Sequence, residues 1–293
     1  MAAPQGRLSA SGRVRRRKRI NRAIEGSWLL ASGLAVAVLG IVTGSVLARG
    51  IPALNLDLFT KTPVTFGETG GGIAHAFVGS LILVGLAAVI ALPVGVLSAI
   101  YVSEFADQRV ARGIKLTLDV LNGLPSIVIG IFLFTLLVVG RGQNGFIGAL
   151  ALAIIMLPLI SRSTQEVLAL VPNHLREASL ALGVSKWRTI LGVILPTTFS
   201  GILTGTTLAV ARAAGETAPL LFTSSLFGDW VSGNAGHPLA SIPVIIFEYS
   251  EAPDPHLNDQ AWAAAFVLIT FVLVTSLLSR ALLARSRRRL ERA

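Results

Sequence analysis

The chain has 293 residues, of which 53% are hydrophobic and only 14% are charged, and its mean hydropathy is +0.73. This balance excludes a water-soluble globular protein and is typical of a polytopic membrane protein. The net charge of +10 does not indicate a nucleic-acid-binding protein, because the basic residues lie between and beside apolar segments instead of on one folded domain.

The residue types of the chain also exclude several kinds of site. Cysteine is absent, so disulfides and thiolate metal sites are excluded, and the four histidines do not show the spacing of metal ligands. No nucleophile, base and orienting residue stand in a recognisable catalytic arrangement. We therefore expect no metal, no cofactor and no catalytic residue in this chain.

Residues 1–22 form a basic tail that we predict to be disordered and cytoplasmic. The tail lacks the short apolar core and cleavage site of a secretory signal, and the apolar segment after it is long enough to span a membrane. We assign residues 23–70 to a first transmembrane helix and an external loop.

Six apolar segments are long enough to cross a bilayer, since a helix needs about 20 residues to span a hydrocarbon core of about 30 Å. Continuous apolar runs without alternation predict helices and not a barrel. The predicted fold class is therefore all-α, with a transmembrane domain over residues 71–285. The six segments lie at 27–48, 73–102, 117–140, 145–162, 194–222 and 261–284.

The distribution of basic residues predicts the orientation in the membrane. Most of the 25 lysine and arginine residues lie in the tail, in the connections at 103–116 and 162–190, and at the C-terminal end, which includes residues 286–293. The positive-inside rule then predicts a multi-pass cell-membrane protein with both termini in the cytoplasm. The opposite connections carry only Arg49, Lys61 and Arg141.

Three polar or helix-breaking residues near the spans are interpreted as structural. Glu104 and Asp119 lie near the predicted inner boundary, where contact with solvent would explain their charge. Pro125 is expected to kink the segment at 117–140.

The connection at 162–190 is predicted to form short amphipathic helices that break at Pro172 and Gly183. Such helices either lie on the bilayer surface or dock into a partner protein, and the periodicity leaves both interpretations open. The apolar residues that recur every three or four positions are Leu168, Val171, Leu175, Ala178 and Leu182.

The spacing within this connection favours docking. The letters EAS are followed by three residues, a glycine, nine residues and VILP, which resembles the EAA loop that permeases of ABC importers present to their ATPase subunits. Ser179 and Val193 depart conservatively from that pattern. The resemblance implies a short coupling helix whose ATPase-docking residues are Glu177, Ala178, Ser179 and Gly183.

Four further stretches narrow the resemblance. They read LNGLPSIVIGIF, SRSTQEVLALVPNHLREASLALG, ARAAGETAPLLFT and PLASIPVIIFEYS, and together they are similar to the PstA family of phosphate-importer permeases from about residue 70 onward. The resemblance implies a type I ABC importer permease with a MetI-like core. It also implies three kinds of partner: a PstC-like second permease, two PstB-like ATPase subunits and an external PstS-like phosphate-binding protein.

ATP hydrolysis is assigned to another polypeptide on this chain's own residues. No GxxxxGK[ST] sequence is present, and none of the four lysines follows a glycine. We expect ATP and Mg²⁺ to be bound by the partner ATPase.

Arg212 and Glu216 form a charge pair within the fifth apolar segment. On a helix with about 100° per residue they share a stripe with Gly201 and Gly205, where another helix could approach closely. Four interpretations remain open: a structural ion pair, an arginine that snorkels to the surface, a proton relay, or a weak anion site in the transport pathway.

The pathway interpretation is favoured because a guanidinium stays charged and its forked donors match two oxygens of a tetrahedral oxyanion. In the PstA family the matching arginine and glutamate are thought to lie along the phosphate path. Gly215 and Pro219 should interrupt the helix and expose backbone amides, and Thr217 adds a hydroxyl. The substrate-pathway residues are thus Arg212, Glu216 and Thr217.

The external segment at 223–260 carries acidic and no basic residues. Its apolar piece LASIPVIIF is too short to span, and we predict that it packs as a re-entrant or surface helix. Two other functions remain open for the whole chain: a permease for another oxyanion such as sulfate or molybdate, and a proton-coupled secondary transporter in which Glu216 titrates.

Overall fold

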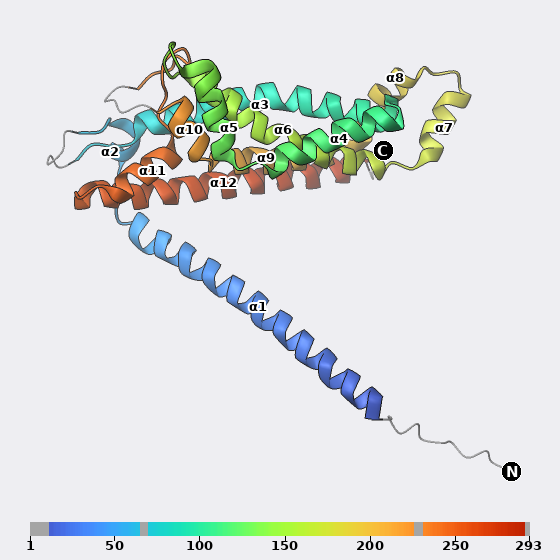
Figure 1. The fold of residues 1–293 in the computed structure, drawn as a ribbon, viewed down its shortest axis with the longest axis horizontal. Helices are drawn as coiled ribbons and strands as arrows, with labels where there is room; N and C mark the ends of the chain where they lie inside the picture. Colours follow the sequence, from blue (N-terminus) through green and yellow to red (C-terminus); the bar gives the residue numbers. More distant parts are fainter. Residues whose placement is uncertain (1–11, 65–69, 226–230, 291–293) are drawn as a thin grey trace. The chain divides into compact units, whose positions relative to one another are not determined.

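The computed structural model describes residues 12–64, 70–225 and 231–290, and every regular element within these ranges is a helix (Figure 1). Two compact units are present, residues 1–48 and 49–293. The first unit consists of helix α1 (Gly12–Gly50) up to residue 48. Residues 12–22 were predicted to be disordered but are helical, because arginine and lysine are good helix formers. Residues 1–11 lie outside the described part.

The second unit is a bundle of helices that includes three short π-helical turns. In chain order the elements are α2 (Leu56–Thr60), α3 (Ala74–Ile100), η1 (Tyr101–Phe105), α4 (Gln108–Gly123), α5 (Ser126–Leu133), η2 (Phe134–Val138), α6 (Gly145–Ala169), α7 (Asn173–Ala181), α8 (Lys186–Thr189), η3 (Ile190–Ile194), α9 (Leu195–Ala214), α10 (Ala218–Thr223), α11 (Ile242–Glu251) and α12 (Pro255–Leu290). Of the basic C-terminal segment 286–293, the structure describes the helical backbone as far as Leu290.

Within the described residues, five helical segments are long and apolar enough to cross a membrane, and a sixth span results when α4 is counted together with α5 and η2. The six-helix prediction is confirmed in this sense. The kink expected at Pro125 in the segment 117–140 is confirmed, and it is a bend of 97° between α4 and the following helix. Pro125 is the cause: it has no backbone N–H to donate, and it forces Leu124 into an extended conformation (φ −71°, ψ 135°).

The core of the second unit lies where α3 packs against α6. Ala87, Ala91 and Leu152 are fully buried there, and Gly95 lies so close to Ile160 that an added Cβ would collide with that side chain. Small residues let membrane helices approach closely, which replaces the hydrophobic driving force that is missing in lipid.

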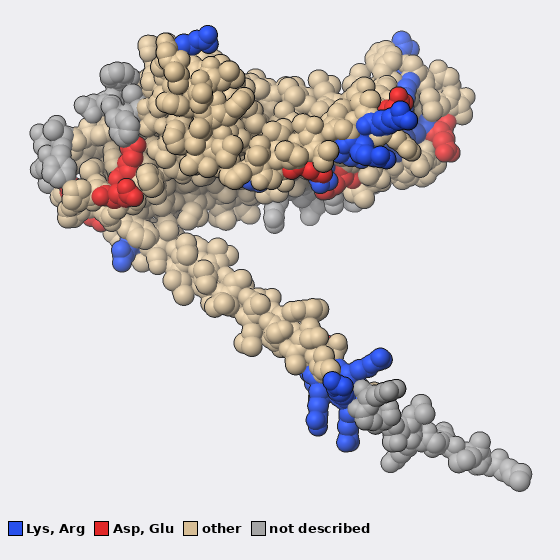
Figure 2. Space-filling view, in the orientation of Figure 1, with Lys and Arg blue, Asp and Glu red and all other residues tan. Residues whose placement is uncertain are grey.

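Charged side chains gather towards the two ends of this unit, and an uncharged surface lies between them (Figure 2). Helices α7 and α8 lie at the same end as the C-terminal end of α12 (Figure 1). The predicted orientation requires this arrangement, because it places the connection at 162–190 and the C-terminal end on the same side of the membrane.

Helix α11 contains the apolar piece of the external segment, and it packs on the bundle as predicted. Ile242, Ile245 and Tyr249 are buried in a cluster with residues of α12. The backbone N–H of Ile242 donates to Ser80 Oγ in α3 at 2.8 Å. Residues 226–230 of the same segment lie outside the described part.

Candidate functional site

The connection at 162–190 contains helix α7, which begins and ends at the two predicted breaks. Pro172 precedes its first residue, and Gly183 follows it with φ +75°. The backbone N–H groups of Gly183 and Val184 donate to Leu180 O and Ser179 O at 2.9 and 3.1 Å. A left-handed glycine directly after a helix is the usual way to satisfy its last carbonyl groups, which explains why a glycine is required here.

The apolar stripe of this loop is only partly used inside the protein. Leu168 and Val171 are buried in a cluster with Ile190 and Ile194, whereas Leu182 is 83% exposed. The segment therefore packs on its own bundle with one face. The other face of α7 is free within the described structure.

Three of the predicted docking residues, Glu177, Ala178 and Gly183, are exposed. Large apolar side chains near them are exposed as well: Leu180 is 53% exposed and Trp187 is 55% exposed. An exposed apolar surface beside a carboxylate is typical of a protein interface. The fourth docking residue, Ser179, instead forms a hydrogen bond of 2.7 Å with the Thr189 hydroxyl of α8.

Glu104 was interpreted as a solvated residue, and this interpretation is wrong. Its side chain is only 6% exposed and forms a salt bridge of 2.8 Å with Arg176, the residue directly before the docking motif. The two residues are 72 positions apart, so no local spacing in the sequence could have indicated the pair. Asp119 fits its interpretation better, because it is 45% exposed and pairs with an exposed Arg162 at 2.7 Å.

Arg212 lies in the last turn of α9, two residues before the helix ends at Ala214. Its side chain is 48% exposed, and Nε lies 3.6 Å from Glu216 Oε1. This separation allows an ion pair but exceeds hydrogen-bond length, so the bidentate grip that arginine can form is not made here. The C-terminal end of the helix dipole places partial negative charge beside the guanidinium.

The predicted stripe on α9 is confirmed for the glycines and corrected for Glu216. Added Cβ atoms at Gly201 and Gly205 would collide with Val167 and Ser163, so α9 approaches α6 closely at both positions. Glu216 is not on the helix, because α9 has already ended. Its side chain, 16% exposed, reaches Arg212 from the following turn.

The interruption predicted at Gly215 is confirmed, but two of the expected free amides are already used. The N–H of Gly215 donates to Arg212 O, and the N–H of Glu216 donates to Ala213 O, both at 3.1 Å. Thr217 precedes the short helix α10, which starts at Ala218. These two amides are therefore not free to bind an anion.

Helix α10 is held firmly, which fixes the turn before it. Pro219 is buried against α5, at a place where only a glycine, Gly130, leaves room. At the other end, Gln143 donates to the carbonyl groups of Leu221 and Phe222 and accepts from the N–H of Ser225. Sequence reasoning missed Gln143, because a glutamine in a short connection gives no signal.

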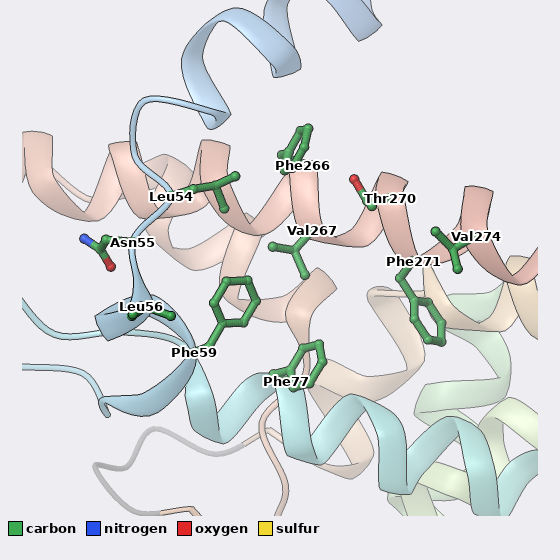
Figure 3. Close-up of a pocket in the computed structure, with 10 residues that line it drawn as sticks. All are labelled: Leu54, Asn55, Leu56, Phe59, Phe77, Phe266, Val267, Thr270, Phe271 and Val274. Atoms are coloured by element: carbon green, nitrogen blue, oxygen red, sulfur yellow. The ribbon is translucent and has the colours of Figure 1, made fainter.

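A groove with a volume of about 580 Å³ lies away from this site, between α2, α3 and α12 (Figure 3). Its lining contains no charged side chain, and its two polar residues are Asn55 and Thr270. The Asn55 side chain already accepts the N–H of Leu58. A phosphate in this groove would lose its hydration without gaining a cationic donor, so the groove is excluded as the anion site.

The chain matches one protein family over most of its length. Residues 91–292 match the family described as binding-protein-dependent transport system inner membrane component. Among curated proteins, the phosphate transport system permease protein PstA of Haemophilus influenzae is 42% identical over 76% of this chain and 79% of its own length. The protein with the same description from Xylella fastidiosa (strain Temecula1) is 40% identical over 87% of this chain and 89% of its own length.

Solved structures with a similar fold are more distant in sequence. A bacterial alginate ABC transporter in complex with a pentasaccharide-bound periplasmic protein has a chain with a TM-score of 0.61 and 14% identity, covering 89% of this chain and 96% of that one. A chain of the inward-facing MetNI methionine ABC transporter has a TM-score of 0.58 and 18% identity, covering 73% and 95%. These likenesses concern the fold.

Proposed function

We propose that this chain, which belongs to the PstA permeases within the family of binding-protein-dependent transport system inner membrane components, is the non-catalytic membrane subunit of an ATP-driven inorganic phosphate importer. The observation that carries the proposal is the half-exposed side chain of Arg212 at the break between α9 and α10. A charged side chain within a membrane span almost always faces a partner helix or a water-filled passage. A pathway shared with a second permease provides both.

In this proposal Arg212 binds the anion during passage, and Glu216 limits how tightly. The carboxylate lies 3.6 Å from the guanidinium and competes with phosphate for it. Conduction requires a site that binds favourably and still releases its ligand, so an arginine with a nearby competitor suits a pathway better than an arginine alone. Thr217, in the same turn, adds a hydroxyl to the wall.

The partners follow from the two surfaces of the chain. Glu177 and Ala178 on the exposed face of α7, together with Gly183 after the helix, dock to one of two PstB-like ATPase subunits, which bind ATP and Mg²⁺. Ser179 supports this surface through Thr189 of α8. A PstC-like permease completes the pathway, and a PstS-like protein delivers phosphate from outside. Both termini lie in the cytoplasm, in line with the basic residues at the two ends of the sequence.

The test is purification of the complete complex followed by reconstitution into proteoliposomes. We expect the four kinds of subunit to purify together and phosphate to enter only when ATP and the loaded binding protein are present. Sulfate and molybdate should not compete. Uptake that sulfate or molybdate abolishes would assign another oxyanion, and uptake by this chain without ATP or an ATPase subunit would assign a secondary transporter.

A further inference from the structure

Helix α7 is connected through the chain to α6 and, through α8 and η3, to α9. No such connection leads from α7 to α3, although α3 packs against α6 along the core. Any movement that ATPase subunits impose on α7 must therefore reach α3 through side chains. Apolar packing contributes, since Ile100 of α3 is buried in a cluster against which Leu175 of α7 packs. The polar contact that can carry the movement joins Glu104, in the turn η1 at the end of α3, to Arg176 of α7.

We propose that the Glu104–Arg176 ion pair is the positioning element that couples the movement of the docking helix α7 to helix α3. This inference rests on the proposed function, because it assumes that an ATPase docks on α7. Neither residue touches the transported anion in this account. Both act through the helices that they join.

The Arg176 guanidinium is held by hydrogen bonds to several groups at once. Arg176 Nη2 and Nε donate to Glu104 Oε1 at 2.8 and 3.1 Å. The same guanidinium donates to Val171 O at 2.7 Å and to Leu168 O at 3.0 Å. One side chain thus joins η1, the end of α6 and the turn before α7, and it cannot shift without rearranging bonds to all three.

Because the Glu104–Arg176 pair is buried, each charge depends on the other for compensation. The side chains of Glu104 and Arg176 are only 6% and 21% exposed. Removing one partner of a buried pair leaves the other charge without compensation, whereas two exposed partners are compensated by water. The buried pair therefore holds η1 and α7 in one register.

A second contact joins η1 to the coupling region from the other side. Lys186 Nζ of α8 lies 5.1 Å from the centre of the Phe105 ring, one residue beyond Glu104. A cavity of about 160 Å³ is lined by residues of both contacts, among them Glu104, Arg176 and Lys186. η1 is itself a π-helical turn, in which the N–H of Ala106 donates to Tyr101 O, and such irregular turns are frequent at functional sites.

The residue order within α7 suits this role. Glu177, which faces outward toward the proposed ATPase, is the direct neighbour of Arg176, which faces inward. A push on the outer face of a nine-residue helix moves its inner face as one body. The displacement would then reach α3 one residue away from the docking contact.

The experiment compares Glu104→Gln with Asp119→Asn in the complete reconstituted complex. Glutamine keeps the size of the side chain and removes its charge, and Asp119→Asn removes a salt bridge that is exposed on both sides. For Glu104→Gln we expect the ATPase subunits to stay bound and phosphate imported per ATP hydrolysed to fall about tenfold. For Asp119→Asn we expect a change of less than about twofold.

A rescue experiment separates coupling from simple stabilisation. The chain has no cysteine, so a Glu104→Cys/Arg176→Cys double variant can be bridged selectively in this subunit by a short, reducible bis-thiosulfonate reagent. We expect bridging to restore import per ATP and reduction to abolish it again. The two single cysteine variants, treated in the same way, should not recover.

Three outcomes would overturn the inference. The first is normal import per ATP in Glu104→Gln. The second is failure of bridging to restore import per ATP in the double cysteine variant. The third is loss of bound ATPase in Glu104→Gln and in the double cysteine variant, without recovery on bridging, which would indicate a structural role alone. A wild-type complex that hydrolyses ATP without importing phosphate would instead contradict the proposed function itself.

Discussion

At the scale of single residues, the site is defined by a charge pair that is only partly formed. The 3.6 Å separation between Arg212 and Glu216 and the 48% exposure of the arginine leave its forked donors accessible to an anion. A purely structural pair would bring the two groups into bidentate contact and bury them. The sequence showed both charges, whereas their spacing and exposure could be learned only from the structure.

The competing role of Glu216 predicts a particular kinetic effect. In Glu216→Gln the competitor loses its charge, so phosphate should bind Arg212 more tightly and leave more slowly. We expect both KM and kcat of phosphate uptake to fall, each by about two- to tenfold. The measurement is the concentration dependence of uptake into proteoliposomes. An unchanged KM with a lower kcat would indicate that Glu216 does not compete for the anion.

A second residue predicts a dependence of stability on pH. Burial raises the pKa of Glu248 in α11 from 4.5 to about 7. Its Oε1 is buried and has no hydrogen-bond partner among the described residues. The folded state therefore holds this proton more tightly than the unfolded state, which adds stability below pH 4.5 that is lost as the pH rises through 7.

Glu248→Gln should remove this dependence. Relative to the wild type, the variant should gain unfolding free energy between pH 4.5 and 7, by about 1 kcal/mol because the carboxyl group is still partly solvated. Thermal unfolding in detergent at pH 5 and pH 8 checks it, with Glu251→Gln, on the exposed end of the same helix, as the control. Equal pH dependence in the wild type and Glu248→Gln would contradict the assignment.

At the scale of elements, the limits of the helices were predictable where a residue type dictates the backbone. Pro172 and Gly183 mark the ends of α7, and the glycine adopts φ +75°. The bend of 97° before Pro125 was expected only as a kink, because the angle depends on what α5 packs against. The Glu104–Arg176 pair was not predictable at all, since it joins elements far apart in the sequence.

Gly183 provides a direct test of the coupling element. An alanine at φ +75° should cost about 1–2 kcal/mol and disturb the turn between α7 and α8, whereas asparagine tolerates this conformation better. We expect Gly183→Ala to lower the amount of ATPase subunit that purifies with the complex, and Gly183→Asn to retain most of it. Equal retention by both variants would show that the left-handed turn is not needed for docking.

The close approach of α9 to α6 predicts a compensating pair of mutations. A Cβ at Gly205 would collide with the Ser163 side chain, so Gly205→Ala should destabilise the protein by about 1–3 kcal/mol. Adding Ser163→Gly removes the colliding atoms and should restore much of the loss. Gly113→Ala on the exposed side of α4 is the control, because nothing lies within 4 Å of its added Cβ. The measurement is thermal unfolding of the three variants. If Ser163→Gly restored no stability to Gly205→Ala, the close approach of α9 to α6 at this position would be contradicted.

At the scale of the whole molecule, the chain has the features of half a transporter. The exposed face of α7 and the half-exposed Arg212 are both explained by the proposed partners, and the sequence lacks a nucleotide-binding loop. The membrane spans and the docking loop could be predicted because their signals are local and periodic. The proposed pathway could not, because in this account its wall is formed jointly with another chain.

The most direct measurement is phosphate uptake by the complete complex with Arg212→Ala, scored beside ATP hydrolysis stimulated by the loaded binding protein. The account predicts that the complex assembles normally and that phosphate uptake falls at least about tenfold, with Arg212→Lys intermediate because lysine keeps the charge and loses the fork. Wild-type uptake in Arg212→Ala, in a complex whose ATP hydrolysis remains dependent on loaded binding protein, would contradict the placement of this arginine in the phosphate pathway.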